Sequence, residues 1–290
     1  WVWARWWRSG SEAEEETMLL KDPEWGMLIV FYFFLGGIAG GAYFTAAIAD
    51  NFGEARDRRV MQTGYLLSVP LIALCGVLLI LDLGVPSRFM NMLGRFKFWD
   101  PMSIGAWALG AFGAIAFVSA LMSFSDAQAA LRRKLGLVGI VFGFFVAAYT
   151  GVLLSNSALP QWEGGRLMGA LFLASGASTG MAAISLILFL TGAGAGEGWA
   201  KVKRADRFSI IIELVTLALF LWVLGSAAGP LLSGKLAGLF WGGLVVVGLL
   251  VPLAIELAGP KARAVAALSA VLVLVGGFVL RYVLLMAIHA

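Results

Sequence analysis

Eight long apolar runs constrain this chain more than any other feature of its sequence. They cover residues 26–49, 63–84, 103–124, 135–157, 167–191, 208–227, 237–258 and 264–288. A helix of about 20 apolar residues spans a bilayer, whereas a lone strand in lipid leaves its backbone groups without hydrogen bonds. The sequence therefore predicts an all-α integral membrane protein with eight transmembrane helices, which the short loops suggest are arranged as two four-helix bundles.

The composition excludes a soluble protein. Of the 290 residues, 61% are hydrophobic and only 13% are charged, and the mean hydropathy is +0.91. A soluble domain cannot bury that much apolar surface. We therefore expect lipid around the chain and no nucleic-acid partner. The net charge of +4 says little about partners, because the placement of Lys and Arg matters more than their sum in a membrane protein.

The scarcity of metal-ligating side chains limits the cofactors. The chain has one cysteine, Cys75, and one histidine, His289, near its end. Disulfide frameworks and Fe–S clusters need several cysteines, and a haem held between helices by two histidines needs both of them in the membrane. We therefore expect no haem, no Fe–S cluster and no metal in this chain.

The basic residues predict an orientation. Loops 50–62, 125–134, 192–207 and 259–263 together carry twelve Lys and Arg, against eight in the N-terminal segment and the remaining loops. The positive-inside rule places the richer loops in the cytoplasm and both termini outside. No run resembles a cleaved signal peptide. Since the sequence begins at Trp1 rather than Met, residues of the natural chain can precede it.

The chain divides into three predicted parts. Residues 1–24 form an interfacial, extracytoplasmic segment with several tryptophans suited to the headgroup layer. Residues 25–160 form the first four-helix bundle and residues 161–290 the second. The segments FFLGGIAGGAYF (33–44) and LFLASGASTGMA (171–182) both follow Phe and Leu with small residues. This similarity suggests a duplication, although composition alone could produce it.

Four ionisable residues lie inside the apolar runs: Asp82, Glu213, Glu256 and Arg281. A charge in the membrane is costly, so such residues usually have a role. The predicted topology groups Asp82 with Arg88, Tyr149 and His289 near the outer surface, and places Glu213 and Glu256 together near the inner surface. The alternatives are structural: an Asp82–Arg88 ion pair or helix cap, an internal counter-ion role for Arg281, and glutamates that reach the interface or pair with a loop lysine, namely Lys201, Lys203 or Lys261.

The first run also contains four clustered glycines. Gly36, Gly37, Gly40 and Gly41 form two overlapping GxxxG pairs. Small residues at this spacing let helix backbones approach closely. The two interpretations are helix packing alone and a glycine-lined groove that admits a flat ligand.

Several ordered motifs together resemble the family of polysulfide-reductase membrane subunits, of the NrfD/PsrC type. They are YFFLGGIAGGAYF (32–44), LDLGVPSRFMNML (81–93), DPMSIGAWAL (100–109), YTGVLLSNSALPQW (149–162) and FLASGASTGMA (172–182). The resemblance is specific over residues 25–190. Beyond that region only the number of helices and Glu213, Glu256 and Arg281 agree with it.

The resemblance implies a membrane subunit that binds quinone or quinol, either menaquinone or ubiquinone, in a multi-subunit respiratory oxidoreductase of the bacterial cytoplasmic (inner) membrane. Such subunits carry no redox centre and do not act on the terminal substrate themselves. The implied partners are a ferredoxin-like Fe–S subunit with four clusters and a catalytic subunit, often of the molybdopterin type. Electron flow in either direction is compatible with the motifs.

The resemblance also implies the site residues. A quinone site would be lined by Tyr32, Gly36, Gly37, Gly40, Gly41, Asp82, Arg88 and Tyr149. A proton path would use Asp82, Tyr149, Glu213, Glu256 and Arg281. The Fe–S partner would dock on the loop that carries Arg88, Arg95, Lys97 and Trp99. Where some relatives place a histidine near the quinone, this chain has Tyr32, so a phenol would supply the hydrogen bond.

Two other functions are compatible with eight apolar helices. One is a secondary transporter or an ion or proton channel without a redox partner, and the other is a passive assembly anchor. Transporters often bind their substrate at broken helices near the middle of the membrane. The strongest motif here, residues 81–93, lies instead at a helix end and in the following loop, which favours the redox subunit.

Overall fold

The computed structural model describes residues 26–82, 101–155, 167–193, 197–259 and 262–287. Within these ranges eight helical segments are long and apolar enough to cross a membrane, and no strand occurs. This confirms the predicted all-α class and the eight spans. The main elements are α2 (Met27–Phe52), α3 (Arg58–Asp82), α5 (Pro101–Met122), α6 (Ala129–Ser155), α7 (Met168–Leu190), α8 (Glu197–Leu224), π-helical η5 (Leu239–Leu250) continuing into α10 (Val251–Ala258), and α11 (Arg263–Met286).

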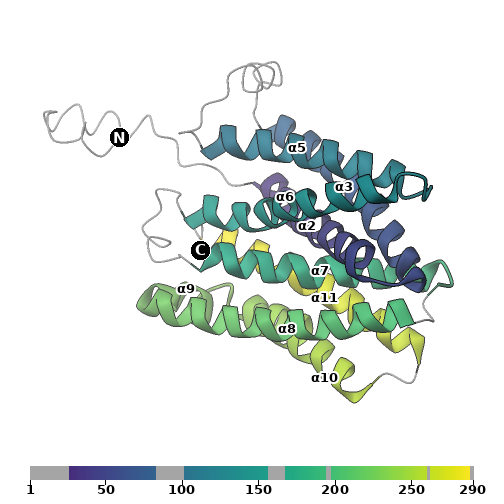
Figure 1. The fold of residues 1–290 in the computed structure, drawn as a ribbon. Helices are drawn as coiled ribbons and strands as arrows, with labels where there is room; N and C mark the ends of the chain where they lie inside the picture. The colour runs from purple at the N-terminus through teal and green to yellow at the C-terminus, as the bar shows by residue number, and fades with distance from the viewer. Residues whose placement is uncertain (1–25, 83–100, 156–166, 194–196, 260–261, 288–290) are drawn as a thin grey trace, which may run out of the picture.

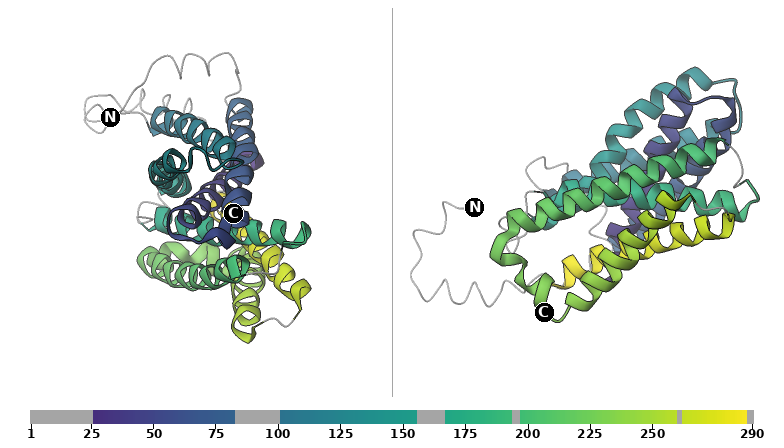
Figure 2. Two further views of the ribbon diagram at one scale, coloured as in Figure 1. Left: turned by 45° about the vertical axis from the view of Figure 1, so that its right-hand side comes forward. Right: turned by 90° about the horizontal axis from the view of Figure 1, so that it is seen from below.

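The helices lie roughly alongside one another, with α5 at one side of the molecule and α8 and α10 at the other (Figure 1). Helix α2 packs against α3, α6, α7 and α11, and α7 packs against α2, α6, α8 and α11. The left view of Figure 2, turned by 45°, again has α5 and α8 at opposite sides of the molecule. The α2–α7 pair therefore joins the two predicted halves, residues 25–160 and 161–290, whose division into separate bundles stays a prediction.

Helices α2 and α7 meet along the two small-residue segments that resemble each other in sequence. A Cβ atom added at Gly41 would lie 2.8 Å from the carbonyl carbon of Gly176 and 3.1 Å from Cα of Gly180. No side chain fits there, because the neighbouring atoms belong to the opposite backbone. We call this contact, formed by Gly37, Gly41, Gly176 and Gly180, the glycine seam.

Two alanine substitutions test whether Gly41 is needed for the close packing of α2 against α7. We expect Gly41→Ala to destabilise the protein by about 1–3 kcal/mol, the range for overpacking a close contact. Gly36→Ala is the matched control, since its Cβ atom would lie at 3.8 Å from the Cys75 Sγ and Val146 Cγ1 atoms, an ordinary contact distance. Thermal unfolding in detergent measures both. Equal loss of stability in the two variants would contradict this account of the seam.

Ion pairs fix the end of the molecule where α2 ends and α3 and α8 begin, which we call the basic end. Arg132 donates two hydrogen bonds of 2.8 Å to the buried Asp50 carboxylate. Lys201 Nζ lies 2.8 Å from Asp57 Oδ2, and Arg58 Nη1 lies 2.6 Å from Asp126 Oδ2. Arginine and carboxylate form such paired contacts readily, so side chains of α2, α3, α6 and α8 are tied together here.

The extent predicted for the loop 192–207 is wrong. Helix α8 begins at Glu197 and continues at its other end into η4 (Gly225–Ala228) and α9 (Gly229–Ser233). Lys203 and Asp206 are buried within its first turns, and Lys203 forms an ion pair with α10. The apolar pattern did not predict this extension, because charged residues normally interrupt an apolar run. Here the charged residues are buried against other helices of the same chain.

Candidate functional site

The end of the molecule opposite the basic end collects several of the predicted site residues. Because α2, α3, α5 and α6 follow one another up and down, the start of α2, the end of α3, the start of α5 and the end of α6 meet there. Tyr32, Asp82, Gly105 and Tyr149 lie on these four segments. We call this region the Tyr32 end.

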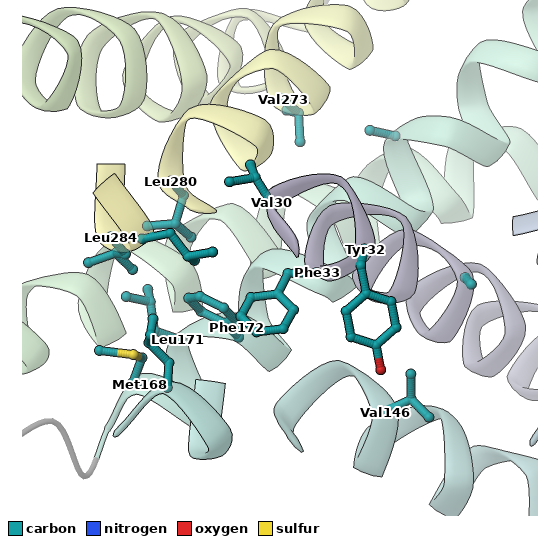
Figure 3. Close-up of a cluster of buried hydrophobic side chains, with 14 of the residues drawn as sticks. Val30, Tyr32, Phe33, Val146, Met168, Leu171, Phe172, Val273, Leu280 and Leu284 are labelled. Atoms are coloured by element: carbon teal, nitrogen blue, oxygen red, sulfur yellow. The ribbon is translucent and has the colours of Figure 1, made fainter. Parts of the chain in front are cut away.

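Tyr32 and Tyr149 are the main hydrogen-bonding side chains of this region. Tyr32 is only 8% exposed, its phenol is within electrostatic range of Cys75 and Tyr149, and its ring points toward Val146 (Figure 3). The Cys75 thiol donates a 3.6 Å hydrogen bond to the Tyr32 carbonyl oxygen. Sequence reasoning did not place Cys75 here, since a lone cysteine in an apolar run carries no spacing signal.

Small residues make room beside the two phenols. A Cβ atom at Gly105 would lie 2.8 Å from the Tyr149 hydroxyl oxygen, so only glycine lets this side chain lie against α5. The Tyr149 ring also stacks on Phe145 at a centroid distance of 5.2 Å. Gly36, one turn after Tyr32, faces Cys75 and Val146 at ordinary contact distances. The region therefore combines two phenol donors with an aromatic and small-residue wall.

Of the other residues predicted for this region, the structure describes only Asp82. Asp82 is exposed at the last residue of α3. Arg88, Arg95, Lys97, Trp99 and His289 lie outside the described residues, as does the N-terminal segment 1–24. The Asp82–Arg88 pair therefore stays a prediction.

Three of the four glycines of α2 pack against neighbouring groups. Gly41 belongs to the seam, and a Cβ atom at Gly40 would lie 2.6 Å from the Gly143 carbonyl oxygen of α6. A Cβ atom at Gly37 would lie 3.2 Å from Cζ of Arg281. Only Gly36 has ordinary space beside it. Of these four glycines, therefore, only Gly36 leaves space beside α2 for a groove of the kind that the sequence suggested.

Arg281 crosses from α11 to α2 and α7. It is fully buried, and it donates hydrogen bonds of 3.0 Å to the Phe33 carbonyl oxygen and 3.1 Å to Ser175 Oγ. Its guanidinium carbon lies 5.3 Å from the centre of the Phe172 ring, which packs against Phe33 (Figure 3). Since Phe33 follows Tyr32 directly, Arg281 lies beside the Tyr32 end.

Glu213 is the acidic residue that interacts electrostatically with Arg281. It is buried on α8 and accepts a 2.5 Å hydrogen bond from Ser178 of α7. Ser178 and the arginine-bound Ser175 lie one turn apart on α7. The structure therefore brings together two predicted residues, Glu213 and Arg281, through two serines that sequence analysis missed.

Glu256 is not directly paired with Glu213. It forms an ion pair with Lys203 and accepts a 3.0 Å hydrogen bond from Ser269 of α11. The lysine pairing is one of the alternatives that the sequence left open. Asp206, fully buried, lies 3.6 Å from Lys203 Nζ and within electrostatic range of both glutamates.

Asp206, which sequence analysis missed, follows a periodic signal. It lies seven residues before the predicted Glu213 and three residues after Lys203, spacings that place all three on one face of a helix. Extending α8 backward from Glu213 by that period would have found Asp206 and the buried position of Lys203. By contrast, no local pattern connects Asp50 of α2 with Arg132 of α6, because their contact spans 82 positions.

In the described part of the chain, no group of three or more His, Cys, Asp and Glu side chains is placed to hold a metal ion. The polar groups form instead a line of ion pairs and hydrogen bonds between helices. Long apolar helices with buried, paired charges define a polytopic integral membrane protein with an internal polar network.

Comparison with known proteins gives the family. The family model "Polysulphide reductase, NrfD" matches residues 16–289, so the chain belongs to this family. It is 30% identical to the C chain of polysulfide reductase from Wolinella succinogenes, over 91% of this chain and 93% of the relative. It is also 27% identical to the protein NrfD homolog of Haemophilus influenzae, over 79% and 82% of the two chains, and 25% identical to protein NrfD of Escherichia coli, over 91% and 94%.

These matches confirm the predicted family. They identify a membrane subunit of a respiratory oxidoreductase, with partners in a multi-subunit complex. They also agree with a multi-pass protein of the inner membrane.

Proposed function

We propose that this chain binds quinone or quinol at the Tyr32 end and exchanges electrons with a ferredoxin-like Fe–S partner, which serves a catalytic subunit, possibly of the molybdopterin type. The observation that carries the proposal is the pair of phenols, Tyr32 and Tyr149, between α2, α3, α5 and α6. Membership of the polysulphide reductase family supports it.

The residues present fit a quinone ring. Its two ring oxygens need hydrogen-bond donors, and its flat faces need apolar or aromatic surfaces. The two phenols supply donors, while Gly36, Val146 and Phe145 supply a wall without charge. When bound, a quinone accepts two electrons and two protons, and a quinol gives them up. Tyr32 and Tyr149 would orient the ring, and Asp82 and Arg88 would line the mouth of the site.

A line of buried polar groups supports a proton path. From the Tyr32 end it runs through Arg281, Ser175, Ser178 and Glu213. From Glu213 the link to Asp206, seven residues back along α8, is electrostatic, and Asp206 and Lys203 then lead to Glu256 at the basic end. Carboxylates and hydroxyls at hydrogen-bonding distances can pass protons in turn. We propose that this line, together with Asp82 and Tyr149 on the outer side, couples the redox reaction to proton movement.

The partner and the orientation follow from the sequence. The loop joining α3 to α5 carries Arg88, Arg95, Lys97 and Trp99, a cationic and aromatic set suited to docking. Electron transfer needs a short distance, so a cluster-bearing partner should bind at the end that holds the quinone. We propose that this end and both termini are extracytoplasmic, with the basic end in the cytoplasm.

One observation favours a second candidate, a proton or ion channel or secondary transporter. The seventh span is π-helical over Leu239–Leu250, and π-helices occur frequently at functional sites. Interrupted helices beside buried charges are typical of transporters. This function would need no Fe–S partner, which makes the two candidates easy to separate.

The test is purification of the native complex in a mild detergent. Partners are identified by mass spectrometry, and Fe–S signals are followed by electron paramagnetic resonance as quinol is added. We expect a ferredoxin-like subunit to co-purify and its clusters to become reduced. Isolation of the protein alone, without Fe–S signals or bound quinone, would contradict the proposal and favour transport.

A further inference from the structure

A cavity of about 380 Å³ opens at the basic end, between the start of α3, the end of α7 and the start of α8. Its rim carries Arg58 and Arg59, together with Trp199 of α8. Its floor is apolar and includes Val60 and Leu188, which belong to a small buried cluster beneath it. The cavity is therefore cationic at the rim and apolar inside.

Two donors at this cavity lack partners among the described residues. The indole nitrogen of Trp199 is buried and forms no hydrogen bond there. Arg59 is exposed and forms no ion pair in the same part of the chain. A buried donor without a partner is costly, so an acceptor bound in the cavity would stabilise the indole N–H.

One of the three arginines at the cavity has no ion-pair partner among the described residues. Arg56 pairs with Glu54 and Glu197, and Arg58 pairs with Asp126, so these two arginines are largely neutralised. Arg59 is not. An arginine without an ion-pair partner binds a phosphate group readily.

Apolar surface for an acyl tail lies next to the cationic rim. A second cavity of about 300 Å³ shares Val60 and Gly198 with the first. Its lining is mainly apolar and includes Ile48 and Phe52, of which Phe52 is 76% exposed. A phosphate beside exposed apolar side chains of transmembrane helices matches a phospholipid better than a free anion in water.

We propose that this cavity binds the phosphate of an anionic membrane phospholipid, held by Arg59 and the Trp199 N–H, with an acyl tail along the adjoining apolar surface. The lipid bridges α3 and α8, which belong to different halves of the protein. This site is separate from the Tyr32 end and does not depend on a quinone or on an Fe–S partner.

The experiment is native mass spectrometry of the full-length protein, delipidated in detergent and titrated with phosphatidylglycerol. We expect Arg59→Gln to weaken the first binding event about fivefold, from loss of one interfacial charge. We expect Trp199→Phe, which keeps an aromatic ring and removes the N–H, to weaken it by a similar factor of about five. The double variant should show a loss of about 20-fold.

Two matched controls make the same chemical changes elsewhere. Arg263→Gln removes an exposed arginine of α11, and Trp222→Phe removes an indole N–H from a side chain that is 79% exposed. Neither residue lines the cavity, so both variants should bind the lipid like the original protein. Thermal unfolding verifies that all four single variants are folded.

Three results would overturn the proposal. The first is equal binding of phosphatidylglycerol by the double variant and the original protein. The second is equal affinity for phosphatidylcholine, which would remove the preference for an anionic lipid. The third is displacement of the lipid by millimolar inorganic phosphate, which would assign the cavity to a free anion. Retained lipid in the controls together with its loss in the double variant supports the proposal.

Discussion

Tyr32→Phe should reduce quinol-dependent reduction of the Fe–S partner by about 100-fold, the lower range for loss of a positioned proton-transfer group. The substitution removes one hydroxyl and keeps a ring that is 8% exposed, so the packing against Phe33 and Val146 persists. Tyr149→Phe should also lower the rate, because it removes the second phenol donor. The rate is measured by stopped-flow spectroscopy on the purified complex with an excess of quinol.

Tyr282→Phe is the control for this prediction. Tyr282 of α11 is half-buried and stacks on Phe278, whose ring packs against Phe31 and Phe34 of α2, so the rate should stay unchanged in this variant. A Tyr32→Phe complex that is folded, contains its clusters and retains the original rate would rule out Tyr32 as the quinone donor. The site would then have to depend on Tyr149, Asp82 or Arg88.

Arg281→Gln should destabilise the protein by about 3 kcal/mol or more, because it removes the positive partner of a buried acid. The guanidinium is 0% exposed and also binds the Phe33 carbonyl oxygen. Glu213→Gln should cost less, since Ser178 can still donate its hydrogen bond to the amide oxygen. Unfolding in detergent, followed by circular dichroism, gives the free energies.

A double-mutant cycle tests whether the two charges act together. The variant Arg281→Gln with Glu213→Gln should be more stable than Arg281→Gln alone, because neither charge is then left uncompensated. Purely additive losses would show that Arg281 acts through Phe33 and Ser175 and not through Glu213. Arg263→Gln, at an exposed position, should leave the stability unchanged.

The eight spans and the family could be predicted from the sequence because the apolar runs are long and clearly separated. The motifs that indicate the family lie between Tyr32 and Ala182. Helix ends were less predictable where charged residues are buried, as at the start of α8. There, Lys203 and Asp206 resemble loop residues unless the ion pair of Lys203 with Glu256 on α10 is known.

Side-chain partners were the least predictable part of the candidate site. Glu213 and Glu256 were expected as a pair, but each is bound to a different helix. The four glycines of the first helix were treated alike, although Gly37 faces a guanidinium, Gly41 a backbone and Gly36 a thiol. These differences depend on which helix lies opposite, and contacts between distant segments leave no local pattern in the sequence.

The contact between Arg281 and the Phe33 carbonyl has a consequence for biosynthesis. The two residues are 248 positions apart, and a ribosome adding about 5–20 residues per second needs roughly 12 to 50 s to cover that distance. During this time α2 is already in the membrane without α11 beside it, and for the first part of it without α7 as well. The newly made α2 therefore has to stay at the insertion machinery, or bind temporary partners, until α11 has been synthesised and enters the membrane.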